Sequence, residues 1–373
     1  MKYFKLFLLA CAIAVVCSAC SKKEEAVGDS SKGELSNMKD SKFAVIHSKM
    51  MDRGCEIVNY NDTGSKLSSV SLKDCVGFTS STQSDNNMYF SSNRSNYHVL
   101  IDKNNGEVNH LQTKSLSKST DDEGAFFINY SNGYVLHDIN VGFTENGLEG
   151  ELVYWKEDGG NNKKQVELEG SLTSAVFEDG KIYAVINNNN DSVIASSIDS
   201  KNHKEKRKEI DMASVFFPDN NESLKSLNNK ELLVAVNDAV DSKKNSMLVI
   251  LDKKTLDTKR KIVMDKGFTI YKINVDKERV TIVSYEGEVK TFNKDLKEIS
   301  SEKIPLHFKS DDERLEEVKI LGGKIYALVR MFDRDKDGVI GRIIEYNIES
   351  KDSKEISLKS DRDWEMTSME VIR

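Results

Sequence analysis

The segment LVILDKKTLDTKRKI, which runs from Leu248 to Ile262, contains the pattern that determines the predicted fold. Four consecutive apolar residues end at Leu251, and a polar turn begins at Asp252. A second run rich in Lys and Arg then leads to Ile262. A short apolar run, a polar turn and a returning run are typical of two antiparallel β-strands, so this segment predicts a β-hairpin.

The same unit occurs seven times along the chain. A large apolar residue ends the first strand of each unit, and these seven marker residues are Tyr60, Ile101, Trp155, Ile198, Leu251, Phe292 and Tyr346. The successive spacings are 41, 54, 43, 53, 41 and 54 residues. The blades of four-stranded β-propellers repeat with periods of about 40 to 50 residues, so the spacings predict one such hairpin per blade.

The two ends of the repeat region supply one further period. The chain has 27 residues after Tyr346 and 19 residues between Ser41 and Tyr60, which together make 46. We therefore expect the segment Asp363–Ile372 to be the innermost strand of the first blade, where it closes the ring. Its apolar residues Trp364, Met366, Met369 and Val371 are available for packing.

These observations predict an all-β fold, a single seven-bladed β-propeller of four-stranded blades that spans residues 41–373 and whose ring is closed by the C-terminal strand. Two β-sandwiches are the alternative, but they would not explain seven hairpins with matched ends. One segment departs from the strand pattern, because the charges of residues 310–319 suit a short helix. We expect the propeller to be a monomer.

The chain resembles the bacterial YVTN-type and quinoprotein-like β-propeller proteins. The resemblance rests on the repeated motif at residues 180–184 and 323–327 (Gly-Lys-Ile-Tyr-Ala) and on strand-end aspartates such as Asp102 and Asp252. It implies the fold and says little about activity, because propellers include both binding modules and enzymes. Quinoprotein enzymes carry recurrent Trp motifs, which Trp155 and Trp364 alone cannot supply, so no quinone cofactor is expected.

The N-terminus has the features of an export signal. Lys2 and Lys5 precede an unbroken apolar run from Leu6 to Val16, which is too short to span a bilayer as a helix. Small residues, Ser18-Ala19, then precede Cys20, and this arrangement resembles the bacterial lipoprotein signal. The family usually has Leu where this chain has Cys17. The resemblance implies that residues 1–19 are removed and that Cys20 is lipidated, whereas the alternative is an ordinary signal peptide cleaved elsewhere.

The next segment, residues 20–40, predicts a disordered tether because it contains few apolar residues. Removal of the signal changes the net charge from −7 to −9. An acidic ectodomain of this kind argues against nucleic acid as a partner. We therefore expect a protein of the cell envelope, held to a membrane by its lipid, whose partner is an envelope protein or a small ligand.

No catalytic signature is recognisable. Nucleophile-elbow, zinc-protease, P-loop and dinucleotide motifs are absent from the sequence, and its six histidines are scattered. Two function classes remain, a binding or scaffold module and an extracytoplasmic lyase or hydrolase with residues gathered at the central channel. A channel lined by converging His, Glu, Asp or Arg would favour the enzyme, and one lined by Val, Ser and small residues would favour the scaffold.

Cys55 and Cys75 bracket the first hairpin, and export makes their oxidation feasible. Pairing about a turn centred on Ser65 places Tyr60 opposite Val70 and Cys55 opposite Cys75, at a separation that a disulfide tolerates. We therefore predict a Cys55–Cys75 disulfide. Two free thiols are the alternative, because a slip of one residue would put the cysteines on opposite faces.

Residues 333–341 contain a candidate cation site. Asp333, Asp335 and Asp337 followed by Gly338 have the spacing with which a calcium loop begins, and three carboxylates at alternate positions can converge on one ion. The flanking segments are strand-like, so the loop resembles the calcium-binding hairpin turns of some β-propellers rather than an EF-hand. This resemblance implies a structural Ca²⁺ ion, and the alternative is a solvated acidic turn.

Overall fold

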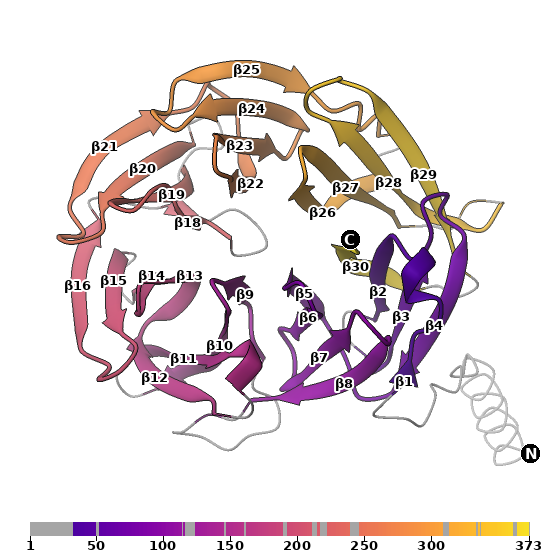
Figure 1. Cartoon of the computed structure of the whole chain (residues 1–373), viewed down its shortest axis with the longest axis horizontal. Coiled ribbons are helices and arrows are strands. Elements are labelled where there is room, and N and C mark those ends of the chain that lie inside the picture. Colours follow the sequence, from indigo (N-terminus) through magenta and orange to yellow (C-terminus); the bar gives the residue numbers. More distant parts are fainter. Residues whose placement is uncertain are drawn as a thin grey trace, which may run out of the picture.

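The computed structural model describes most of the chain from Gly33 onward. The described residues are 33–49, 52–113, 115, 124–144, 147–159, 162–188, 192–210, 215–216, 222–238, 246–308, 313–332, 335, 337–360 and 364–372. They form seven antiparallel sheets arranged in a ring, and the strands of each sheet follow one another from the centre outward (Figure 1). The predicted seven-bladed β-propeller is confirmed.

The first three blades are built from the chain up to Glu169 together with the last strand. The first blade has the order β30 (Glu365–Val371), β2 (Phe43–Ser48), β3 (Cys55–Tyr60), β4 (Lys66–Leu72). The second consists of β5 (Phe78–Gln83), β6 (Asn87–Ser92), β7 (Tyr97–Asp102) and β8 (Glu107–Gln112), with β1 (Gly33–Glu34) added outside β8. The third consists of β9 (Ile128–Ser131), β10 (Tyr134–Thr144), β11 (Gly147–Lys156) and β12 (Lys164–Glu169).

The remaining blades follow in chain order. The fourth consists of β13 (Ser171–Glu178), β14 (Lys181–Asn187), β15 (Val193–Asp199) and β16 (Glu205–Ile210). In the fifth, β17 (Val215–Phe216) and β18 (Leu224–Ser226) both pair with β19 (Glu231–Asp238), followed by β20 (Met247–Asp252) and β21 (Thr258–Val263). The sixth consists of β22 (Ile270–Val275), β23 (Arg279–Ser284), β24 (Glu288–Asn293) and β25 (Glu298–Lys303), and the seventh of β26 (Glu313–Leu321), β27 (Lys324–Met331), β28 (Val339–Asn347) and β29 (Ser353–Lys359).

The repeated hairpin of the sequence joins the third and fourth strands of each blade. In six blades an Asp or Asn directly follows the marker residue, and its side-chain oxygen accepts the backbone N–H two residues later. These six residues are Asn61, Asp102, Asp199, Asp252, Asn293 and Asn347. Such side-chain bonds mimic a backbone turn, and they explain why the repeat is visible at the turns.

The Gly-Lys-Ile-Tyr-Ala motif lies at the turn between the first and second strands of two blades. Gly180 has φ 73° after Asp179 with φ 50°, and Gly323 has φ 75° after Gly322 with φ 58°. Two successive residues with positive φ form the type I′ turn that suits the twist of a two-residue hairpin, and glycine adopts this conformation without steric cost. The Ile-Tyr-Ala part of the motif then begins a buried second strand.

The hydrophobic core lies between neighbouring blades. Tyr183 and Val185 of the fourth blade, for example, belong to one buried cluster with Leu232 and Val234 of the fifth. Each such side chain removed from water contributes roughly 1.5–3 kcal/mol, so the sheets are stabilised chiefly by stacking on their neighbours. Each blade therefore needs a neighbour on both sides.

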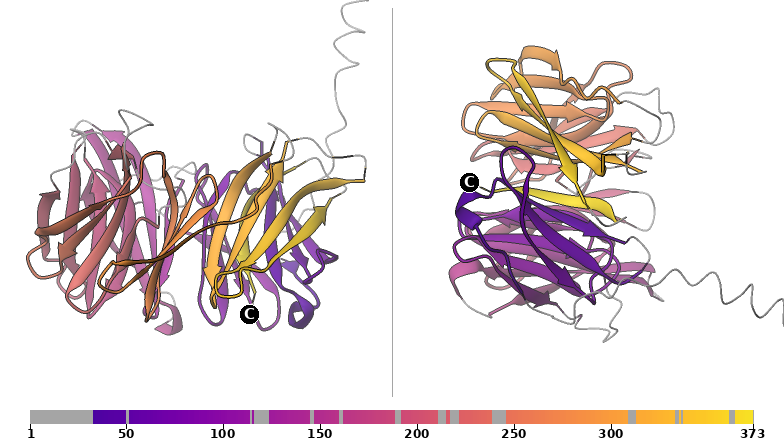
Figure 2. Two further views of the ribbon diagram at one scale, coloured as in Figure 1. Left: turned by 90° about the horizontal axis from the view of Figure 1, so that it is seen from above. Right: turned by 90° about the vertical axis from the view of Figure 1, so that its right-hand side faces the viewer.

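The C-terminal strand supplies that neighbour where the ring begins and ends. β30 pairs antiparallel with β2, with Phe43 opposite Val371 and Val45 opposite Met369. The C-terminus consequently lies beside the first blade, as Figure 2 shows. Trp364, Met366, Met369 and Val371 are all buried, so the predicted ring closure is confirmed.

Two segments differ from the sequence prediction, and the first is the expected tether. Part of the expected disordered tether belongs to the propeller, because β1 pairs with β8 and a 3₁₀ turn, η1 (Met38–Asp40), follows it. Leu35 is fully buried and Met38 nearly so, and these two apolar residues fix the segment to the first two blades. Within the described residues, the segment 33–40 thus packs on the propeller, whose predicted start is Ser41.

The expected short helix at residues 310–319 is a strand in its described part. Residues 313–321 form β26, the innermost strand of the seventh blade. The charges of this segment suggested the solvated face of a helix. In the strand, however, Glu317 and Lys319 are two residues apart and lie on the channel side, whereas Val318 between them packs in the core. The prediction failed because these buried charges are neutralised by partners distant in the sequence.

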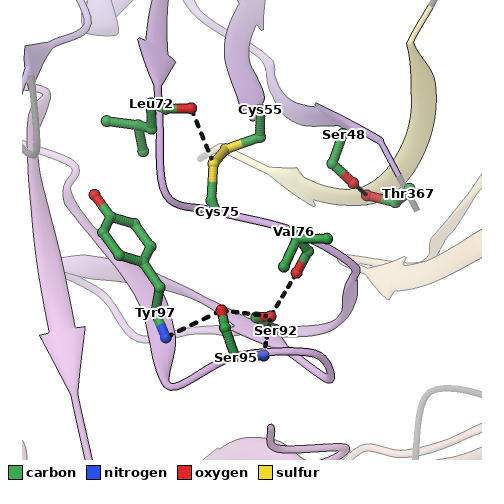
Figure 3. Close-up of a disulfide and its surroundings, with 9 residues drawn as sticks. All are labelled: Ser48, Cys55, Leu72, Cys75, Val76, Ser92, Ser95, Tyr97 and Thr367. Atoms are coloured by element: carbon green, nitrogen blue, oxygen red, sulfur yellow. Dashed lines mark hydrogen bonds between the residues drawn. A yellow bond between two sulfur atoms is a disulfide. The ribbon is translucent and has the colours of Figure 1, made fainter. Parts of the chain in front are cut away.

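Cys55 and Cys75 form the disulfide that the sequence predicted, with their Cα atoms 5.7 Å apart (Figure 3). The predicted register is wrong, because Cys55 lies opposite Leu72, and Tyr60 lies opposite Lys66. Cys75 follows the end of β4, and the Gly54 N–H donates to its carbonyl oxygen at 2.7 Å, which brings the chain back to Cys55. A cross-link over 20 residues stabilises a fold by about 3 kcal/mol.

Candidate functional site in the central channel

A polar cavity lies where the innermost strands of several blades converge. It has a volume of about 190 Å³ and is lined by Thr82, Gln83, Asn129, Tyr130, Glu222, Lys225, Lys272, Asn274, Lys319, Ile320, Leu321 and Glu370. Most of these residues belong to β5, β9, β18, β22, β26 and β30, the strands nearest the ring centre in Figure 1. The geometry of a propeller thus collects, at one place, side chains from six of its seven blades.

Lys319 is the centre of an ion-pair network in this channel. Its ammonium nitrogen lies 2.7 Å from Glu370 Oε1 and 3.7 Å from Glu317 Oε1. The same nitrogen donates to the Ser81 carbonyl oxygen at 3.0 Å and to Ser81 Oγ at 2.9 Å. Glu317 is fully buried and Lys319 and Glu370 nearly so, and such burial is tolerable because the charges are paired.

A second group of charges lies on the fifth and sixth blades. The Glu222 carboxylate accepts one hydrogen bond from Lys272 at 2.7 Å and another from Lys225. Glu222 lies two residues before β18, and β17 and β18 both pair with β19 in the fifth blade.

The charges of the network displace the pKa values of its members. Burial raises the pKa of Glu317 to about 7, with the neighbouring carboxylates of Glu370 and Glu222 acting in the same direction against Lys319 and Lys272. Burial alone would lower the pKa of Lys319, but Glu317, Glu370 and Glu222 outweigh it and raise that pKa. Burial would likewise raise the pKa of Glu222, yet Lys225, Lys272 and Lys319 hold it well below its usual range.

This arrangement does not supply an activated nucleophile. Ser81 Oγ lies within hydrogen-bonding distance of a lysine amine, as in some hydrolases, but the raised pKa keeps Lys319 protonated and unable to accept the serine proton. The hydroxyl of Ser368 contacts Ser81 Oγ at 2.9 Å, so both serines are bonded within the network. The groups that line the cavity thus offer fixed charges and amides for recognition of a ligand.

The histidines do not converge on the channel. His98 and His137 are buried with their ring centroids 4.4 Å apart, and His47 is buried against Tyr60 with 3.1 Å between Nε2 and the phenol oxygen. Burial lowers the pKa of His47 to about 4 and that of His137 to about 3, so both are neutral near pH 7. Their places in strands agree with the structural role that the sequence favours.

The other predicted site residues are partly outside the described residues. Cys20 and Asp333 both lie outside them. Asp335 Oδ1 accepts the backbone N–H groups of Asp337 and Val339, each at 2.8 Å, in the turn between β27 and β28. Within the part of the chain that the structure describes, no group of three or more His, Cys, Asp or Glu side chains is arranged to hold a metal ion. The calcium site therefore stays a prediction.

Sequence reasoning did not identify the channel residues, although a signal was present. Glu317 and Lys319 alternate on one strand, and Ser368 and Glu370 alternate on the predicted closing strand. Charged residues on an innermost strand face either the channel or the core, so the predicted topology could have assigned Glu370. Lys272 and Glu222 carry no comparable local signal, because only the ring brings them together.

Comparison with known proteins gives the fold class alone. No protein-family model matches the chain, and no curated protein sequence is significantly similar to it. The fold is similar to that of AztD from Citrobacter koseri in its apo form, with 12% identity, a TM-score of 0.51 and coverage of 88% of this chain and 97% of that chain. It is also similar to the dihydro-heme d1 dehydrogenase NirN in complex with DHE, with 11% identity, a TM-score of 0.50 and coverage of 94% and 84% respectively.

These similarities place the chain among the seven-bladed β-propellers. At such low identities they carry no argument about ligand or activity. Among the residues that the structure describes, no helix is long and apolar enough to cross a membrane.

The raised pKa of Glu317 predicts a pH-dependent effect of Glu317→Gln. The folded protein retains the proton up to about pH 7, whereas the unfolded chain releases it near the ordinary value of 4.5. The wild-type protein therefore loses stability as the pH rises through this window, and a glutamine does not. Relative to wild type, the variant should gain up to about 3 kcal/mol between pH 4.5 and 7.5, measured by urea unfolding. Glu349→Gln, at an exposed position, is the matched control, and an unchanged difference at the two pH values would contradict the assignment.

The aspartates of residues 333–337 predict stabilisation by calcium. A ligand that binds only the folded state at 100 times its dissociation constant adds about 2.7 kcal/mol, which should raise the melting temperature by several degrees. The double variant Asp333→Ala/Asp335→Ala should show no such rise. Equal melting temperatures of the wild type in calcium and in chelator would show that the predicted calcium site is wrong.

Proposed function

We propose that this protein is a lipid-anchored, extracytoplasmic β-propeller that acts as a binding module and holds its ligand in the polar cavity of the central channel. One observation carries the proposal: five charged side chains from four blades line that cavity and are held in place by ion pairs. They are Glu222, Lys225, Lys272, Lys319 and Glu370. Recognition groups that are already fixed lose little conformational freedom when a ligand binds.

The neighbouring side chains support binding of a small ligand or of a short segment of a protein. Gln83, Asn129 and Asn274 add amides around the charged groups, and Tyr130 adds an aromatic face. The cavity is smaller than the roughly 300–1,000 Å³ of pockets that enclose a drug-sized ligand. We therefore expect the cavity to take one functional group or a compact molecule.

The alternative is a lyase or hydrolase that works in the same channel. Converging glutamates are the feature that the sequence reasoning associates with an enzyme, and a carboxyl group with a pKa of about 7 suits a general acid or base. Glu317, however, is fully buried and lies behind Lys319, so a substrate would first have to displace that lysine from Glu370 and Ser81. For this reason we favour binding.

The proposed location rests on the N-terminal sequence and on the disulfide. Cys20 follows a short apolar export signal and two small residues. The Cys55–Cys75 disulfide supports export, because such bonds persist in oxidising compartments outside the cytoplasm. Two acyl chains on one cysteine would supply the two signals that stable membrane attachment requires.

The anchor predicts that Cys20→Ala releases the protein from membranes or leaves its signal uncleaved. The measurement is fractionation of cells that produce wild type or variant, followed by mass determination of each form. Cys17→Ala is the matched control and should fractionate as wild type does. A Cys20→Ala protein that is cleaved and still sediments with membranes would refute lipidation at this residue.

The channel proposal predicts that Asn274→Trp, which places a large side chain in the cavity, abolishes ligand capture. Immobilised wild-type protein should retain a molecule from envelope extracts, identified by mass spectrometry, that the variant does not retain. Lys266→Trp adds the same side chain at an exposed position and should behave as wild type. If wild type and Asn274→Trp, both folded by circular dichroism, retain the same molecules, binding in the channel is wrong.

A further inference from the structure

The Glu222 carboxylate shows what kind of group the channel recognises. Its two oxygens accept hydrogen bonds from ammonium groups on neighbouring blades, Lys225 of β18 and Lys272 of β22. Glu222 itself lies two residues before β18 of the fifth blade. A carboxylate is thus bound between a lysine three residues away in its own blade and a lysine that the ring brings from the next blade.

Lys272 has capacity for a further acceptor. Only 4% of its side chain is exposed, and among the described residues its ammonium group donates to Glu222 alone. An ammonium group has three donors, so Lys272 has donors left for a further acceptor in the cavity that it lines. Burial lowers the pKa of Lys272, with the charges of Lys319 and Lys225 acting in the same direction against the carboxylates of Glu222 and Glu317.

We propose that Lys225 and Lys272 form a binding site for a small anion carrying a carboxylate or phosphate group, and that Glu222 occupies this site as a built-in competitor. This inference rests on the proposed binding function and adds the chemical class of its ligand. The incoming anion bridges the two ammonium groups in place of the Glu222 carboxylate, while the amide of Asn274 lines the same cavity. A volume of about 190 Å³ corresponds to roughly six water molecules, which suits inorganic phosphate or a small dicarboxylate.

The competition predicts that Glu222→Gln strengthens anion binding. We would titrate inorganic phosphate, succinate and, as an uncharged control, glycerol into purified protein by isothermal titration calorimetry. The variant should bind phosphate or succinate at least tenfold more tightly than wild type, because the competing carboxylate is gone. Glu222→Gln/Lys272→Met should lose this gain, and glycerol should bind to none of the proteins. Comparison of phosphate with succinate identifies which of the two anionic groups the site prefers.

A matched control is present elsewhere in the chain. Glu345 also bridges two lysines, Lys42 and Lys324, each at 2.5 Å, but it does not line the cavity. Glu345→Gln should leave anion affinity unchanged, which separates a local effect from a change in overall charge. An equal gain from both substitutions, or affinity that survives Lys272→Met, would overturn the anion site.

The outcome is separable from that of the capture experiment. If wild type retains a molecule that Asn274→Trp loses, yet neither anion binds Glu222→Gln, the channel function stands and the anionic class is wrong. If the anions bind Glu222→Gln tightly while no molecule is captured, the anion site stands and the proposed function of the wild-type channel is wrong. Thermal unfolding of every variant confirms that each comparison concerns a folded protein.

Discussion

The pairing of β30 with β2 is the constraint on which the rest of the structure depends. Each blade is stabilised by stacking on two neighbours, and a linear array of seven blades would leave one apolar face exposed at each end. By pairing Phe43 with Val371 in one sheet, the chain joins its own ends and removes both exposed faces. Closure also fixes the distance across the ring, and therefore which inner-strand side chains meet in the channel.

Closure and the channel network are coupled through Lys319. This lysine belongs to β26 of the seventh blade, but it contacts Glu370 on the closing strand and Ser81 on β5 of the second blade. Gln83 of β5 adds hydrogen bonds to Glu370 and to the Val371 carbonyl oxygen. Three consecutive blades are thus joined across the point where the chain ends meet, and the same contacts form one wall of the cavity. A change in Lys319 would affect the closure and the site together.

The features that could be predicted from the sequence are those produced by local chemistry. Asp252 and Asn347 form turns with backbone groups two residues away, so the repeat and the blade number were visible in the chain. The features that were missed depend on partners distant in sequence: β26 accommodates Glu317 and Lys319 because Glu370 and Ser81 lie across the channel. Likewise, Leu35 holds part of the expected tether in place because it packs in the core between the first two blades. Cys75 bonds to Cys55 from beyond the end of β4, whereas the residue paired with Cys55 in the sheet is Leu72.

The position of Glu222 shows where a repeated fold acquires specificity. Regular blades place equivalent positions around the axis, and a ring of equivalent residues would surround the channel with similar side chains on every side. The fifth blade breaks this regularity, because two short strands, β17 and β18, both pair with β19, and Glu222 beside β18 contacts two lysines. Burial of this carboxylate is tolerable because both of its oxygens are paired with ammonium groups. The channel is therefore asymmetric at the fifth blade, while the stacked blades supply the frame that keeps its charges in place.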